Sequence, residues 1–386
     1  MREAKRLEKI QPSVVRRLFD LAVGTRDVIS LGVGEPDITT PEHIRRAAKR
    51  ALDEGKTHYS PNTGIPELRQ AIADRYSSGY GVDYYAKSEV MVVVGGTEAL
   101  FCAIAAFLNP GDEVILPEPG YLTYDPAVRI AGGSPVGVPV DEPDFRMRPQ
   151  DIEAAITDRT KLIMLNFPSN PTGAVMPADE IREILDIARE HDLLVLSDEI
   201  YEAFTYDGLK HVCVPAIDRE RVILVNGFSK TYAMTGWRVG YVCAPKELME
   251  PMFKVHQNVT SSTNTFAQWA AVEALRGPQN CVRKMVADYD KRRKLTFELL
   301  NSIPGFKCPM PKGAFYAFAN VKALGMRSEE LADYIFKRAK VVVSPGTAFG
   351  RLGEGYLRVS YANKPKNIEL AVERIKKALE QRGLSR

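Results

Sequence analysis

Six short segments of this chain are almost entirely apolar, and most of them alternate with stretches that suit amphipathic helices. The apolar segments lie at 90–95, 113–117, 161–166, 193–197, 222–227 and 238–244. Runs of Val, Ile and Leu without polar alternation are typical of parallel strands that are buried on both faces of a sheet. Helices are expected near 98–108, 123–131, 150–156 and 177–190. Together these segments predict an α/β fold, with a mainly parallel sheet and helices on both faces.

One strand of that sheet should run against the others. The connection between 222–227 and 238–244 is only about ten residues long, which is shorter than the crossover that two parallel neighbours need. One of these two strands is therefore predicted to be antiparallel to its neighbours, which makes the sheet mixed.

The sequence pattern changes after Gly277 and Pro278. A long amphipathic helix is expected from 280 to 301. Its basic residues are predicted to form a solvated face; they are Arg283, Lys284, Lys291, Arg292, Arg293 and Lys294. Further on, a smaller α+β unit is predicted, with strands near 315–320, 341–344 and 356–361 and helices near 328–339 and 366–381.

The composition is that of an ordinary globular protein, and its length suggests two domains. The 386 residues are 45% hydrophobic and 26% charged, and 52 basic against 49 acidic side chains give a net charge of +3. This balance argues against nucleic acid or an anionic membrane as the main partner. The longest apolar run is too short to span a bilayer. The first residues carry charges of both signs, unlike a secretory signal, so a cytoplasmic protein is expected.

Cysteine and histidine offer little for a metal centre. The five cysteines are scattered without a C-x-x-C pair, which predicts reduced thiols. His211 and Cys213 are the only close His/Cys pair, and one pair cannot complete a structural zinc site. We therefore expect no bound metal.

Polar side chains stand at the carboxyl ends of three apolar segments. They are Asn170, Asp198, Tyr201, Ser229 and Lys230. Ligands of open α/β sheets bind at this edge of the sheet, outside the carboxyl ends of the strands. These side chains are therefore predicted to converge on one site.

Lys230 is the candidate nucleophile of that site. A lysine amine in a partly desolvated pocket beside a fixed cation loses some of its proton affinity and can attack an aldehyde. Arg238 supplies a cation shortly afterwards, and the hydroxyl of Ser229 precedes the lysine. A hydroxyl and a guanidinium both suit a phosphate. The three residues suggest a phosphate-bearing aldehyde, of which pyridoxal phosphate is the common one.

A glycine-rich turn provides further candidate contacts to a phosphate. Gly95, Gly96 and Thr97 lie between a predicted strand and a predicted helix. Glycine lets the backbone approach an anion closely, and the free N–H groups and the positive end of the helix dipole point towards it. Gly96 and Thr97 are therefore predicted to bind the phosphate together with Ser229 and Arg238.

These motifs occur in the order and spacing of a known family. The chain resembles the class I, fold type I pyridoxal-phosphate-dependent aminotransferases in Asn170-Pro171-Thr172-Gly173, Asp198-x-x-Tyr201, Ser229-Lys230 and Arg238. The similarity extends to motifs at Gly32-Val33-Gly34-Glu35-Pro36-Asp37, Tyr59 to Arg69, Gly95 to Leu100, and Tyr356-x-Arg358-x-Ser360. It covers essentially the whole chain and is strongest to archaeal-type members described as aspartate or aromatic aminotransferases.

The resemblance implies a role for each cofactor contact. Lys230 would bind the cofactor covalently and then move the substrate proton. Asp198 would keep the ring nitrogen protonated, so that the ring can accept electrons. Tyr201 and Asn170 would donate hydrogen bonds to the phenolate oxygen, and Tyr121 would stack on the ring.

The resemblance also implies substrate contacts and a dimer. Arg358 would clamp the substrate α-carboxylate through a bidentate pair, and Gly34 and Asn170 would also contact the substrate. Tyr59 is similar to a phosphate-binding tyrosine that reaches in from the neighbouring subunit, which implies a homodimer with shared active sites. In this family the N-terminal segment completes the small domain, which implies a large cofactor-binding domain at 46–279 and a discontinuous small domain at 1–45 and 280–386.

The implied reaction moves the amino group of an L-amino acid to a 2-oxo acid. The expected mechanism is a ping-pong exchange between pyridoxal phosphate and pyridoxamine phosphate, with 2-oxoglutarate as acceptor and aspartate or an aromatic amino acid as donor. Some aspartate-specific members carry a lysine in the Gly-Gly-x turn, where this chain has Thr97, so the donor stays open. A pyridoxal-phosphate-dependent β-lyase or another fold type I enzyme is the alternative, because Lys230, Asp198 and Arg238 would look the same.

Two alternatives from other classes fit the sequence less well. A nicotinamide dehydrogenase would need a third glycine in the motif that begins at Gly32, where a proline instead interrupts the helix start. An aminotransferase-like sensor of a transcription regulator would carry a DNA-binding segment ahead of the fold, whereas the first motif begins by Gly32.

Overall fold

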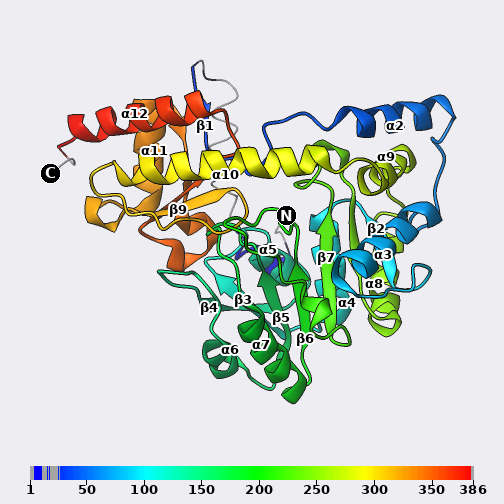
Figure 1. The fold of residues 1–386 in the computed structure, drawn as a ribbon. Coiled ribbons are helices and arrows are strands. Elements are labelled where there is room, and N and C mark those ends of the chain that lie inside the picture. Colours follow the sequence, from blue (N-terminus) through cyan, green and yellow to red (C-terminus); the bar gives the residue numbers. More distant parts are fainter. Residues whose placement is uncertain (1–3, 11–14, 16, 18–24, 26, 384–386) are drawn as a thin grey trace.

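A seven-stranded sheet forms the centre of the part of the chain that this computed structural model describes, which is residues 4–10, 15, 17, 25 and 27–383 (Figure 1). Its strand order is β2-β8-β7-β6-β5-β3-β4. The strands are β2 (Val90–Val93), β3 (Glu113–Glu118), β4 (Ser134–Pro139), β5 (Thr160–Asn166), β6 (Leu194–Asp198), β7 (Val222–Gly227) and β8 (Gly240–Cys243). β8 is antiparallel to β2 and β7, and the other neighbours are parallel. The predicted mixed sheet with one reversed strand is confirmed.

Within the seven-stranded sheet, β4 is the strand that the sequence pattern did not predict. Pro135, Gly137 and Pro139 interrupt its apolar residues, and prolines argue against a central strand because they cannot donate to the ladder. At the edge of the sheet, next to β3 alone, the strand tolerates them.

Helices cover both faces of the sheet, because each strand sends alternate side chains to opposite faces. In β5, Leu162 and Met164 face one layer, and Ile163 and Leu165 face the other. The first layer contains α4 (Gly96–Phe107), α5 (Tyr124–Ile130) and α8 (Lys246–Val259). The second contains α3 (Pro66–Tyr80), α6 (Pro149–Ala155), α7 (Ala178–Glu190) and α9 (Thr265–Arg276), with α2 (Glu42–Asp53) packed on α9. The predicted α/β architecture is confirmed.

A second unit lies above this sheet in Figure 1, where α10, α11, α12 and β9 gather. Its antiparallel sheet has the order β11-β12-β9, with β9 (Tyr316–Asn320), β11 (Ser344–Pro345) and β12 (Tyr356–Ser360). Its helices are α10 (Asn280–Asn301), α11 (Ser328–Ala339) and α12 (Pro365–Gln381). β1 (Ile29–Ser30) pairs in parallel with β10 (Val341–Val342), so the N-terminal segment lies beside the C-terminal part of the chain. The domain boundaries themselves stay a prediction.

Short 3₁₀ turns connect several of these elements. They are η1 (Lys5–Leu7), η2 (Val214–Ala216), η3 (Thr235–Trp237), η4 (Lys322–Leu324), η5 (Gly346–Phe349) and η6 (Arg351–Gly353). Within the described ranges, each helix is either too short or too polar to cross a lipid bilayer.

The sequence pattern predicts that the basic residues of α10 all face solvent, but two of them do not. Arg292 and Arg293 are buried, whereas their basic neighbours on the helix are exposed. Arg292 donates to Asp37 at 2.8 Å, and Arg293 binds Asp207 and Asp290, each at 2.6 Å. The prediction was wrong for these two residues because Asp37 and Asp207 are distant from them in sequence. Only the folded chain brings these acidic partners to α10.

Replacing Arg293 with alanine should lower the free energy of unfolding by about 2 kcal/mol, which is less than for a fully buried pair because Asp207 can be rehydrated. The side chain of Arg293 is 0% exposed, and that of Asp207 is 51% exposed. Chemical denaturation measures the change. Lys294→Ala, which removes an exposed partner of Asp290, is the matched control and should cost about 0.5 kcal/mol or less. Equal losses in the two variants would contradict this account of Arg293.

Candidate active site

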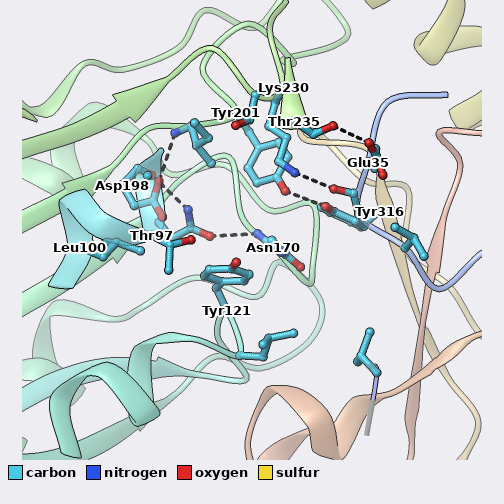
Figure 2. Close-up of a pocket in the computed structure, with 18 of the residues that line it drawn as sticks. Glu35, Thr97, Leu100, Tyr121, Asn170, Asp198, Tyr201, Lys230, Thr235 and Tyr316 are labelled. Atoms are coloured by element: carbon cyan, nitrogen blue, oxygen red, sulfur yellow. Dashed lines mark hydrogen bonds between the residues drawn. The ribbon is translucent and has the colours of Figure 1, made fainter. Parts of the chain in front are cut away.

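A cavity of about 520 Å³ lies at the carboxyl ends of β5, β6 and β7 (Figure 2). Its volume is in the range of sites that bind small molecules and cofactors. The cavity brings together the predicted residues from both units of the fold. Those that line it are Gly34, Gly96, Thr97, Tyr121, Asn170, Asp198, Tyr201, Ser229, Lys230, Arg238 and Arg358.

Tyr59 is the one predicted contact that lies outside this cavity. Its side chain is 92% exposed, so it makes little contact with its own chain. A large apolar ring so exposed is available to another molecule.

The side chain of Lys230 lines the cavity. Lys230 follows β7, and its Nζ donates a hydrogen bond to the carbonyl oxygen of Gly34 at 2.6 Å (Figure 2). Burial lowers the pKa of Lys230 to about 8; the charges of Arg358 and Arg238 act in the same direction, and that of Glu35 opposes them. A substantial fraction of the amine is therefore neutral, and nucleophilic, near pH 8.

Asp198 ends β6 with its carboxylate held inside the cavity. The hydroxyl of Tyr124 donates to Oδ2 at 2.8 Å, and the backbone N–H of Ile200 donates to Oδ1 at 3.2 Å. Burial raises the pKa of Asp198 to about 6, although these two hydrogen bonds act in the opposite direction. Ionised Asp198 is therefore a buried anion that a cationic group in the cavity would stabilise.

Arg358 is a buried guanidinium without an acidic partner in the described residues. Its Nη1 donates to Oδ1 of Asn170 at 2.8 Å, and its Nη2 donates to the carbonyl of Gly32. The Nε is buried and has no hydrogen-bond partner. The rings of Tyr316 and Phe349 lie 4.5 Å and 4.6 Å from the guanidinium carbon. A buried cation with an unused donor is suited to bind a carboxylate in bidentate fashion.

The opposite end of the cavity combines the start of α4 with Arg238. Gly95 precedes α4 with φ of 80°, and a Cβ at this residue would lie 2.5 Å from Nη2 of Arg238. Glycine is therefore required here by both the backbone angle and the packing. Arg238 itself has φ of 55°, a conformation that is uncommon for non-glycine residues. The helix N-terminus and the guanidinium together form a positive surface that suits an anion.

Several residues in or next to the cavity escaped the sequence analysis: Asn166 and Tyr316 line it, and Tyr124 binds Asp198. Tyr124 is three residues after Tyr121 and could have been found as a second aromatic of that motif. Asn166 ends β5, donates to the carbonyl of Asp198 at 3.0 Å and accepts from the N–H of Asn170 at 3.0 Å. Tyr316 in β9 had no sequence signal, because only tertiary packing brings its hydroxyl 2.6 Å from that of Tyr201.

Gly34 is held against Tyr316 by the same packing. A Cβ at Gly34 would lie 2.2 Å from the hydroxyl oxygen of Tyr316. The close approach explains the glycine at this position and brings the carbonyl of Gly34 to Lys230.

Two clusters of His, Cys and Glu lie outside the residues that line this cavity. One contains Glu199, Glu202 and His211, and its side chains already have partners: His211 Nε2 is 2.6 Å from Glu199, and Glu202 pairs with Arg75. The other contains Glu98 and His256, which also bind each other. The expected absence of a metal stays a prediction.

The family model described as aminotransferase class I and II matches residues 26–375. The chain belongs to this family. It is an aminotransferase, and the resemblance in its motifs is confirmed. Aminotransferases act on amino acids and 2-oxo acids.

Named relatives are similar over the whole length of this aminotransferase. It is 46% identical to an aspartate aminotransferase of Pyrococcus abyssi, over 100% of both chains. It is also 46% identical to aromatic-amino-acid aminotransferase 2 of Thermococcus litoralis, over 98% of each chain. The two relatives have equal identity and different named donors, so identity does not decide the substrate.

Solved structures share the fold. The aromatic aminotransferase of Pyrococcus horikoshii has a TM-score of 0.90 and 44% identity, with 96% of this chain and 100% of that chain covered. The Thermus thermophilus aspartate aminotransferase with maleate has a TM-score of 0.93 and 39% identity, covering 98% and 100%. The predicted fold type is confirmed.

Lys230 should react as a weakly basic amine in the cofactor-free aminotransferase. Because burial disfavours the charged form, the neutral amine should reach half of its maximum near pH 8, whereas an ordinary lysine does so near pH 10.4. Competitive labelling with an amine-selective reagent, read by mass spectrometry of each peptide across pH, measures this midpoint. A midpoint for Lys230 near pH 10 would contradict the described environment.

Proposed function

We propose that this aminotransferase binds pyridoxal phosphate in the cavity and transfers the amino group of an L-amino acid to a 2-oxo acid in two successive half-reactions at one site. The acceptor is 2-oxoglutarate, and the donor is aspartate or an aromatic amino acid. One observation carries the proposal: the amine of Lys230 shares a cavity with a buried acid, Asp198, and with two guanidiniums, those of Arg238 and Arg358.

The residues present fit this cofactor. When bound, pyridoxal phosphate supplies an aldehyde that captures amino groups and a ring that accepts electrons. The start of α4, with Gly96 and Thr97, would hold the phosphate together with Ser229 and Arg238. Arg238 supports this role because it has no acidic partner among the described ion pairs, so its charge is available to a ligand.

Lys230 is the residue that would attach to the cofactor and, once released, move the proton. A pKa near 8 leaves enough neutral amine for attack at the aldehyde. The same Nζ would then remove the proton from the α-carbon of the substrate and deliver it to the carbon of the cofactor's aldehyde group. The carbonyl of Gly34, which now accepts from Nζ, would orient the amine between these steps.

Asp198, Tyr201 and Asn170 would tune the cofactor. An ionised Asp198 favours a protonated ring nitrogen opposite it, and Tyr124 holds that carboxylate in place through its 2.8 Å hydrogen bond. Tyr201 and Asn170 would donate to the phenolate oxygen. Tyr121 would stack on the ring.

Arg358 would bind the α-carboxylate of the substrate, with Gly34 and Asn170 beside it. The Nε without a partner and the absence of an acid around the guanidinium in the described chain support this role. The rings of Tyr316 and Phe349, which lie against the guanidinium, would keep its plane fixed, so that little conformational freedom is lost on binding.

A homodimer would complete the site. Tyr59, 92% exposed, would reach the phosphate of the neighbouring subunit, and Val259, 61% exposed, is another apolar side chain that an interface would cover.

The large domain would comprise 46–279, and the small domain 1–45 and 280–386. The cytoplasmic location stays a prediction of the sequence.

Lys230→Ala should still bind pyridoxal phosphate, because the phosphate contacts remain, but should lose transamination by about 10³-fold or more. Wild-type protein should be yellow, and borohydride should abolish the absorbance band and leave the cofactor on the peptide that contains Lys230. Lys246→Ala, which changes an exposed lysine, is the control. Near-normal turnover of the Lys230 variant, or trapping on another lysine, would refute the assignment.

A panel of amino acids should convert the bound aldehyde to the amine form without an acceptor present. We expect aspartate or an aromatic amino acid to react at least about tenfold faster than alanine, because each well-placed side-chain contact contributes on the order of 1–3 kcal/mol to discrimination. Stopped-flow absorbance follows the conversion, and product analysis separates transfer from elimination. Release of ammonia with an elimination product in place of a 2-oxo acid would favour the β-lyase alternative.

A further inference from the structure

A buried histidine lies behind the first turn of α4, outside the residues that line the cavity. His256 of α8 has a side chain that is 0% exposed. Its Nδ1 is 2.8 Å from Oε1 of Glu98, and its Nε2 is 2.7 Å from the carbonyl oxygen of Asn62. Both ring nitrogens therefore face oxygen acceptors.

This geometry favours the doubly protonated form of the ring. A backbone carbonyl can only accept, so Nε2 of His256 carries a hydrogen. Glu98 also acts as an acceptor, because the N–H of Val94 and the hydroxyl of Thr260 donate to it. With Glu98 ionised, Nδ1 carries a hydrogen as well, and the doubly protonated ring donates to both acceptors. Burial acts to lower the pKa of His256, but the bonds to Glu98 and Asn62 outweigh it and raise the pKa.

Glu98 is ionised and close to the proposed phosphate site. It directly follows Gly96 and Thr97, which line the cavity at the start of α4. Burial acts to raise the pKa of Glu98, but the hydrogen bonds from His256, Thr260 and Val94 outweigh it and lower the pKa. An uncompensated carboxylate in this turn would cancel part of the positive potential that a helix N-terminus offers to an anion.

Neither α4 nor β2 holds a cation that could compensate for Glu98, and Arg238, which packs against Gly95, lines the cavity. Glu98 is the only charged residue of α4, and β2 has none. Cys102, whose thiol completes the cluster with Glu98 and His256, stays neutral because burial raises its pKa to about 12. Within the described residues, His256 is the cationic side chain that binds Glu98 directly.

We propose that His256 is a positioning residue whose buried positive charge neutralises Glu98 and thereby allows a phosphate group to bind at the start of α4. The same ring holds the carbonyl of Asn62, in the segment that presents Tyr59 at the surface. The inference rests on the proposed function, because it concerns the phosphate of the cofactor. It adds a residue that never touches the cofactor and acts through Glu98.

The test compares two ligands that differ by the phosphate. Titration of the cofactor-free protein with pyridoxal phosphate and with pyridoxal, followed by absorbance, gives a dissociation constant for each. His256→Gln should bind pyridoxal phosphate about tenfold more weakly than wild type and pyridoxal equally well. Glu98→Gln combined with His256→Gln should bring the affinity for pyridoxal phosphate back to within about threefold of wild type, because neither charge remains. His191→Gln, which changes an exposed histidine, is the control.

A merely structural role for His256 would give a different pattern. Equal weakening for both ligands, no weakening at all, or a double variant as weak as His256→Gln would each overturn the proposal. If His256→Gln fails to unfold cooperatively, the single variant Glu98→Gln decides the question. It should bind pyridoxal phosphate at least as tightly as wild type. Tenfold weaker binding by this variant would overturn the proposal. Failure of the proposed function is distinct, because wild-type protein would then bind pyridoxal phosphate no better than pyridoxal.

Discussion

Positive charge without an acidic counterpart, held at the carboxyl edge of the central sheet by a buried and a half-buried arginine, is the constraint on which this site depends. Arg238 and Arg358 have no carboxylate partner in the part of the chain that is described, and their charges act on Lys230 between them. Holding such cations away from water costs free energy unless anions come to them. A ligand with a phosphate at one end and a carboxylate at the other would supply both anions and leave the amine to react.

The fold delivers these groups from two units that meet at the cavity. The parallel strands β5, β6 and β7 end side by side, so the residues that follow them face one space. Arg358 comes from the separate antiparallel sheet, and Gly34 comes from the N-terminal segment, whose strand β1 pairs with β10. The contacts of Arg358 with Gly32 and Asn170 join the units at the point where the substrate would bind.

Buried charge is balanced differently away from the cavity. Arg292 and Arg293 have acidic partners, and His256 has Glu98, so these charges satisfy one another within the protein. The contrast separates groups that stabilise the fold from groups that await a ligand. It also explains why a run of basic residues in α10 looked like a solvated face when only the helix was considered.

Local pattern alone determined the element types, the mixed parallel sheet, the family and most of the side chains that line the cavity. These features depend on residues that are near neighbours along the chain: an apolar run, then a turn, then Asp198 or Lys230. Only the tertiary structure decided which partners these groups have. Tyr124 on Asp198, Tyr316 on Tyr201 and His256 behind Glu98 are contacts between separate elements, and no short-range periodicity specifies them. The pKa values of about 8 for Lys230 and about 6 for Asp198 arise in the same way, because burial and neighbouring charge exist only once the chain has folded.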